Sequence, residues 1–437
     1  MIPISAATVP RRRIAEILLL VFAFSAWNLT GPAHIALFAL VILFLVDWPV
    51  AGPRLRRDPA FWLGLAAVIL VTLLAVRAAL LFPETAERQW PAIWEWASPF
   101  LFVVFAWWLR GDVRLIRLVL LAALIGLVVG VLRKSDWALL GEALGGMRYH
   151  FGQPALGIAF IASVALLGLA LYRPPLVSAG SGQAVRTLVI AAAWGLAVAF
   201  VVAMLLILQA RGAAVGLLAA GGTLVAYRLW QARGAKRERR SGLVPAAMIL
   251  VLLVAVATAA IWSGRDRLVQ DLAALGPGGD PEALAWTSST AIRINLWRTG
   301  LEVFAARPGL GWGPGTDTTK YLIPNEAVAL PAATLEHAPG AAHLHSVIVE
   351  ALVRFGSTAL LIAVPLAILL VRSGWVMWRR LATEDPRLRE WLVLVALMTG
   401  LFLIYEYRLV HVDMRFFLLL FLGIWYSFSL RPDSDPA

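Results

Sequence analysis

The sequence contains no cysteine and few charged residues, and each shortage excludes a class of protein. Its 437 residues include no Cys, which excludes disulfide frameworks, thiolate nucleophiles and cysteine-ligated metal sites. Only 15% of the residues are charged and 61% are hydrophobic, whereas about a quarter of a soluble domain is charged. A chain of this length cannot hide so many long apolar runs from water. The composition therefore excludes a water-soluble enzyme and indicates that the lipid bilayer is the main solvent.

Acidic residues are also scarce relative to basic ones. The chain has 38 Lys plus Arg against 26 Asp plus Glu, for a formal net charge of +12. An excess of this size sometimes marks a nucleic-acid-binding protein. The densest basic run, 228–240, lacks the alternation of basic and base-stacking aromatic residues typical of such proteins, and it borders an apolar stretch. We interpret the run as a topology anchor and expect no nucleic-acid partner.

Twelve stretches are apolar and long enough to span a bilayer, which requires about twenty residues each. Basic residues gather in alternate connecting segments, and the positive-inside rule assigns these segments and both termini to the cytoplasm. The basic start followed by apolar residues resembles a signal peptide, and we interpret it as an uncleaved first span. The expected spans are 14–30, 33–51, 60–82, 92–109, 115–132, 154–172, 187–208, 212–229, 243–263, 344–371, 390–408 and 415–430.

These spans predict an all-α integral membrane protein of about twelve transmembrane helices in three parts. Residues 1–263 form spans one to nine, residues 264–343 form a large periplasmic helical loop, and residues 344–437 form spans ten to twelve with a cytoplasmic C-terminus. A loop of this length inside a compact protein is expected to contain helices and functional groups. The chemistry is therefore sought in and around this loop.

Apolar spacing predicts two helices within the loop, at 265–275 and 290–306. The second ends before Pro308 and carries a possible i,i+4 ion pair between Arg298 and Glu302. A charged helix with an apolar stripe is suited to the membrane interface. The stripe consists of Ile294, Trp297, Leu301 and Phe304.

A glycine-rich segment follows at 309–316, with the sequence Gly-Leu-Gly-Trp-Gly-Pro-Gly-Thr. It resembles a phosphate-binding loop in composition, but it lacks the Gly-Lys-Ser/Thr ending of a P-loop and follows no predicted strand. Its turn-forming residues favour a tight turn that returns the loop to the membrane.

Three of the six histidines lie close together, at His337, His343 and His345. Imidazoles two residues apart can share a zinc ion, but zinc sites need three or four protein ligands, and no carboxylate cluster beside them supplies the rest. We therefore expect no metal. A catalytic base and an ordinary interfacial histidine both remain open.

Four arginines fall at or near the periplasmic ends of expected spans, at Arg77, Arg148, Arg211 and Arg293. A cation within or beside the membrane is costly and marks a functional site by default. A lone arginine can simply extend its head to the lipid headgroups. Four on the histidine face favour an anion, and guanidinium forks match a pyrophosphate, whose charge they can stabilise without a metal.

Other charged residues near the same face remain open. Glu350 lies four residues before Arg354, which favours an i,i+4 ion pair over a role as the base. A last periplasmic turn contains a group that either orients substrate or is merely solvated. The group is Glu406, Arg408, His411, Asp413 and Arg415.

Three motifs together resemble the bacterial O-antigen ligase and polymerase superfamily. They are Arg-Ile-Asn-Leu-Trp-Arg-Thr-Gly-Leu at 293–301, Arg-Pro-Gly-Leu-Gly-Trp-Gly-Pro-Gly-Thr at 307–316, and His345-Ser346 followed after nine residues by Gly356. The last is similar to the ligase signature in particular. By its motifs the resemblance covers residues 145–360.

The match has identifiable departures. Arg211 stands at the arginine of the family's Arg-x-x-x-Leu element, where Val215 replaces the leucine. Residues 359–361 read Ala-Leu-Leu in place of a second glycine and two threonines. His343 does not match the catalytic histidine, whereas His345 does.

The resemblance implies a metal-independent, cofactor-free glycosyltransferase of the bacterial inner membrane. It would transfer O-antigen polysaccharide from undecaprenyl pyrophosphate to the lipid A core at the periplasmic face. The matched positions imply that His345 is the general base and that Arg211 and Arg293 bind the pyrophosphate, with Arg148 and Arg77 assisting. The alternatives are an O-antigen polymerase and a protein O-oligosaccharyltransferase. A lipid-linked glycan transporter is disfavoured because the sequence shows no repeated halves.

Overall fold

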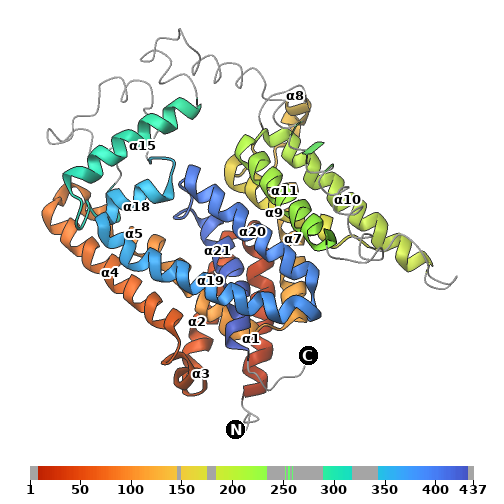
Figure 1. The fold of residues 1–437 in the computed structure, drawn as a ribbon, viewed down its shortest axis with the longest axis horizontal. Coiled ribbons are helices and arrows are strands. Elements are labelled where there is room, and N and C mark those ends of the chain that lie inside the picture. Colours follow the sequence, from red (N-terminus) through yellow and green to blue (C-terminus); the bar gives the residue numbers. More distant parts are fainter. Residues whose placement is uncertain are drawn as a thin grey trace. The chain divides into compact units, whose positions relative to one another are not determined.

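The protein is described from a computed structural model that covers residues 8–144, 149–174, 184–233, 289–316 and 343–431, and a few positions between 251 and 258. Every regular element in these residues is a helix, as Figure 1 shows. The all-α expectation is confirmed for this part of the chain.

The chain forms two compact units, and each combines segments that are distant in sequence. The first consists of residues 1–133, 270–380 and 403–437, and the second of residues 134–269 and 381–402. The division of the chain into two groups of spans and a periplasmic loop at 264–343 is a different one, because it depends on which side of the membrane each segment lies. It remains a prediction.

The first unit contains most of the helices, with the last residues of α7 and α19 outside it. They are α1 (Thr8–Ser25), α2 (Thr30–Val46), α3 (Trp48–Leu55), α4 (Pro59–Leu81), η1 (Pro83–Thr85), α5 (Ala86–Ala97), η2 (Ser98–Leu101), α6 (Phe102–Leu109), α7 (Val113–Lys134), α15 (Ser289–Ala306), α18 (Val347–Phe355), η5 (Gly356–Thr358), α19 (Ala359–Glu384) and α21 (Val412–Leu430).

The second unit contains η3 (Trp137–Leu139), α8 (Leu140–Leu144), α9 (Ala155–Leu171), α10 (Ala184–Leu208), α11 (Arg211–Arg233) and most of α20 (Pro386–Tyr405). Within it, α9 packs against both α10 and α11. An ion pair between Arg228 and Glu390, at 2.6 Å, joins α11 to α20.

Eight helical stretches among the described residues are long and apolar enough to cross a membrane, so the chain is a multi-pass membrane protein. They are Pro59–Leu81, Pro83–Leu109, Val113–Lys134, Val185–Leu208, Arg211–Gln231, Val347–Glu384, Pro386–Tyr405 and Val412–Leu430. The expected total of twelve is not confirmed. Helix α9 is shorter, α1 carries three arginines near its start, and the expected span 243–263 lies almost entirely outside the described residues.

The expected span over 33–51 is broken near its end. Helix α2 ends at Val46, and α3 leaves it at an angle of 82°. Pro49 at the start of α3 has no N–H to continue the α2 ladder. The hinge residue Asp47 is buried and accepts a hydrogen bond from Trp107 Nε1 at 3.0 Å. A local proline and a contact distant in sequence together set the bend.

Two helices near His345 also end or begin at residues other than those expected from the sequence. Helix α20 ends at Tyr405, so Glu406, Arg408 and the residue between them are non-helical. Helix α18 begins at Val347, so His345 precedes it. The Ser346 hydroxyl accepts a bond from the Val349 N–H at 3.4 Å and caps this helix.

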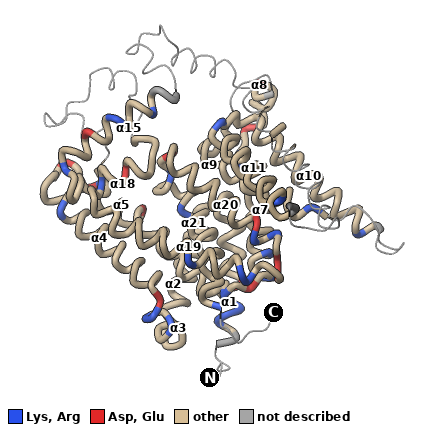
Figure 2. Tube along the Cα trace, viewed as in Figure 1, with Lys and Arg blue, Asp and Glu red and all other residues tan. Residues whose placement is uncertain are grey.

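The predicted loop helix at 290–306 is confirmed as α15, which packs against α18. Its inner face contributes Leu296 and Val303 to a buried apolar cluster that also contains Trp312, Leu344 and Val353. Ile294 and Leu301 of the predicted stripe are about half exposed, at 48% and 49%. Figure 2 shows charged segments of both signs on α15, in contrast to most of the length of α4, which has no charged residue.

Candidate functional site

The backbone of His345 is held in an unusual conformation. Its φ of +51° lies in the left-handed region, which non-glycine residues rarely adopt and which is often found at functional sites. Its N–H donates to Nδ1 of His343 at 3.3 Å, and its carbonyl accepts from Nε1 of Trp297 on α15 at 3.4 Å. The segment before α18 and the loop helix thus fix this residue together.

Glu406 lies between His345 and Arg293. Its Oε1 atom is 3.4 Å from Nδ1 of His345, and its Oε2 atom is 3.4 Å from Nη2 of Arg293. The carboxylate side chain is 3% exposed, whereas those of His345 and Arg293 are 26% and 24% exposed. A buried carboxylate therefore links the expected base to one of the expected pyrophosphate-binding arginines.

The surroundings keep Glu406 ionised. Burial raises the pKa of this carboxyl, but contact with His345 and the positive charge of Arg293 outweigh burial, so its pKa lies below the usual value. This arrangement suits a histidine that gains a proton during a reaction.

His343 is neutral and supports its neighbour. Its ring centroid lies 4.4 Å from that of His345 and 5.3 Å from that of Tyr407. Burial is the main cause that lowers the pKa of His343, to about 3. It is therefore unprotonated at neutral pH, consistent with Nδ1 accepting the His345 N–H.

The sequence left open the role of the charged residues at the last turn, and the structure gives them different partners. Glu406 joins His345, whereas Arg408 donates to the Asp413 carboxylate at 2.9 Å and 3.2 Å. Arg415 contacts the Ser98 hydroxyl at 3.5 Å. His411 lies beside His343, with ring centroids 6.3 Å apart, and its pKa is lowered by burial and by Arg408.

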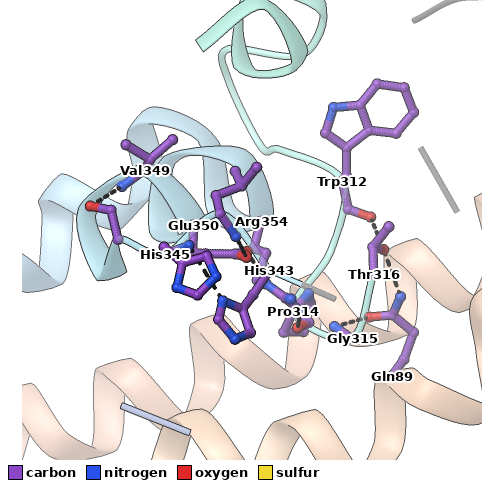
Figure 3. A network of polar contacts seen from close by, with 12 residues as sticks. Gln89, Trp312, Pro314, Gly315, Thr316, His343, His345, Val349, Glu350 and Arg354 are labelled. Atoms are coloured by element: carbon purple, nitrogen blue, oxygen red, sulfur yellow. Dashed lines mark hydrogen bonds and ion pairs between the residues drawn. The ribbon is translucent and has the colours of Figure 1, made fainter. Parts of the chain in front are cut away.

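Glu350 forms the ion pair favoured from the sequence. Its carboxylate is 2.8 Å from Nε of Arg354, and the two side chains are 0% and 5% exposed. Glu350 Oε1 also accepts the Leu344 N–H at 2.8 Å, and Arg354 Nη1 donates to the Pro314 carbonyl. Figure 3 shows this pair between the histidines and the glycine-rich segment. Glu350 thus ties the segment before α18 to the turn at 309–316.

The glycine-rich segment is a tight turn, as its composition favours. Its N–H groups at 311, 312, 313, 315 and 316 all donate to protein acceptors, and residue 314 is proline. Acceptors include the carbonyls of Val353 and Arg354 at the end of α18 and the side chain of Gln89. These five amides are therefore not available to cradle a phosphate.

Replacing Gly313 by alanine is expected to lower the unfolding midpoint in detergent. Gly313 has a φ of +110°, and an added Cβ would lie 2.2 Å from Cβ of Ala78. Strain and overpacking of this kind cost about 1–3 kcal/mol each. Gly309→Ala is the matched control, because an added Cβ there meets nothing within 4 Å. Equal midpoints for the two variants would contradict the role of Gly313.

The four arginines expected to bind pyrophosphate have different environments. Arg293 contacts Glu406, and Arg77 donates to the Gly311 carbonyl at 3.0 Å, so it supports the turn. Arg211 is the first residue of α11 and belongs to the second unit; it lies two residues after Gln209, which has a left-handed φ of +49°. Arg148, like His337, lies outside the described residues.

Sequence reasoning missed Glu406 as the partner of His345. The only available signal was a carboxylate at the expected end of a span beside several charged residues. With it, His343, His345 and Glu406 form a group that can hold a metal ion, since each offers a ligand atom within 4.8 Å of the others. Glu406 therefore offers the third ligand, which the residues next to the histidines in the sequence do not supply.

Residues 196–364 match the protein family described as O-Antigen ligase. The matched segment contains Arg211, Arg293 and His345, but ends before Glu406. Comparison with curated proteins gave no match to the chain.

Proposed function

Because residues 196–364 match the O-Antigen ligase family, we propose that the protein transfers O-antigen polysaccharide from undecaprenyl pyrophosphate to the lipid A core oligosaccharide. The proposal places the reaction at the periplasmic face of the bacterial inner membrane, with both termini cytoplasmic and the 264–343 loop covering the site. It is carried by one observation, the His345 ring beside the buried carboxylate of Glu406.

His345 acts as the general base in this proposal. The acceptor hydroxyl attacks the anomeric carbon of the donor glycan, the bond from that carbon to the pyrophosphate oxygen breaks, and the hydroxyl proton passes to Nε2 of His345. Glu406 faces Nδ1 at 3.4 Å, so it favours the tautomer with a proton on Nδ1 and a free lone pair on Nε2. The same carboxylate stabilises the imidazolium that forms.

The arginines stabilise the departing pyrophosphate. Arg211 and Arg293 bind its oxygens, and Arg148 and Arg77 assist. Guanidinium groups stay charged and offer paired donors, so they can offset the developing negative charge without a metal ion. Arg293 already lies beside Glu406, which supports placing the leaving group near the base.

Three of the four departures from the ligase pattern fall at outward-facing positions, whereas Ala359 packs against a buried apolar cluster. Val215, Leu360 and Leu361 are 52%, 52% and 66% exposed. Apolar residues at such positions suit contact with lipid. They therefore do not argue against ligase chemistry, although they leave the acceptor to experiment.

The proposal is tested by incubating purified full-length protein in detergent with undecaprenyl-pyrophosphate glycan and lipid A core in the presence of EDTA. We expect glycosylated lipid A core, detected by a shift on gels and by mass spectrometry. Lengthening of the donor glycan instead would identify a polymerase, and transfer to a peptide would identify a protein O-oligosaccharyltransferase. Loss of transfer on chelation would contradict metal independence.

Arg211→Ala is expected to lower kcat/KM for the lipid-linked donor about 10²-fold, as removal of an oxyanion-binding group does. Arg211→Lys should recover only part of this, because lysine keeps the charge but not the planar fork. Steady-state kinetics with varied donor concentration measures both. Arg298→Ala is the control, since that side chain is 82% exposed. Full activity of folded Arg211→Ala would remove Arg211 from the pyrophosphate site.

A further inference from the structure

Three potential metal ligands converge from two separate segments of the first unit. His343 and His345 precede α18, and Glu406 follows α20. Each offers one ligand atom, and these atoms lie within 4.8 Å of one another. Among the described residues, this is the one group of histidine and carboxylate ligands so arranged.

The spacing between His345 and Glu406 also suits an ion shared by the two side chains. Nδ1 of His345 is buried, lacks a hydrogen-bond partner among the described residues, and lies 3.4 Å from Oε1 of Glu406. A normal hydrogen bond between such atoms is about 2.7–3.2 Å long. Two ligands at about 2.0–2.1 Å from a tetrahedral zinc ion are separated by about 3.3–3.4 Å.

The ligand types also suit zinc. Two imidazoles and one carboxylate form a three-ligand set that leaves a fourth position open for water. Nδ1 of His343 contacts the His345 N–H at 3.3 Å, a long contact that an ion could replace. Arg293 contacts the other carboxylate oxygen of Glu406, Oε2, and so can orient the carboxylate toward the ion. Its positive charge lowers the affinity of the site for a cation.

We propose that His343, His345 and Glu406 bind a divalent transition metal such as Zn²⁺, and that the bound ion inhibits the enzyme. The inhibitory half rests on the proposed function of His345 as the base. When Nδ1 of His345 holds the ion, the ring proton lies on Nε2, which then cannot accept the proton of the acceptor hydroxyl. Metal binding and base catalysis are therefore mutually exclusive.

The binding half is tested without substrate. Purified full-length protein, stripped with EDTA and dialysed, competes for ZnCl₂ with a chromophoric zinc chelator. We expect one site in the wild type and at least about 10-fold weaker binding in His343→Gln and Glu406→Gln, as loss of groups at a metal site produces. His150→Gln, which changes an exposed histidine outside the group, should bind like the wild type. Equal binding by all four proteins would overturn the site.

The inhibitory half is tested in the transfer assay at buffered free Zn²⁺. Wild-type transfer should fall as the site fills and recover with EDTA, and His343→Gln should need at least about 10-fold more Zn²⁺ for half-inhibition of its own zinc-free rate. Filling of the site without inhibition, or with activation, would overturn the inhibitory role. If the protein binds zinc as expected but transfers no glycan under any condition, the proposed function fails while the metal site stands.

Discussion

His345→Gln is expected to reduce the turnover of glycan transfer by about 10²- to 10⁴-fold, the usual contribution of a general base. The base acts on the acceptor proton as the new bond forms, so kcat should fall while KM for the donor changes little. Single-turnover transfer to lipid A core, measured over a range of donor concentrations, separates these quantities.

The control for this variant must show that the site is otherwise intact. Gel filtration and thermal unfolding in detergent should match the wild type, because the His345 side chain is 26% exposed and its contact with Glu406 is a long one, at 3.4 Å. Glu406→Gln should be less impaired, since it leaves the base in place but removes the charge that favours its imidazolium. Wild-type turnover by folded His345→Gln would contradict the proposed role of His345 as the base.

Arg354→Met is expected to destabilise the protein by about 3–5 kcal/mol, the usual cost of leaving one member of a buried ion pair without its partner. Glu350 is 0% exposed, and its carboxylate would lose the guanidinium at 2.8 Å. The Pro314 carbonyl would lose its donor at the same time. The unfolding midpoint in detergent, or the yield of monodisperse protein, measures the effect.

An exposed pair elsewhere in the chain provides the matched comparison. Arg298 and Glu302 have the same i,i+4 spacing on α15, but they lie 3.7 Å apart and are 82% and 63% exposed. Arg298→Met should therefore change stability by less than about 1 kcal/mol. Glu350→Gln combined with Arg354→Met should recover part of the loss, because no buried charge remains. Equal stability of the two single variants would contradict the role assigned to burial.

Several features followed from the sequence because their causes are local. A shortage of charge and long apolar runs predict membrane helices whatever their packing. Spacing of 3.6 residues predicts the helix found as α15, and i,i+4 spacing predicts both the exposed pair on it and the buried pair on α18. Turn-forming glycines predict the tight turn at 309–316.

The relation of Glu406 to His345 was decided only by the tertiary structure. The two residues belong to segments on either side of α18, α19 and α20, and no periodicity connects positions so far apart. The same holds for the bend at Asp47, which depends on Trp107 as well as on a local proline. The sequence determined that the chain is a helical membrane protein and singled out His345 as a candidate base, because composition and short-range spacing are properties of neighbouring residues. Which carboxylate faces this histidine, and which arginine contacts the same carboxylate, depend on how helices distant in sequence pack.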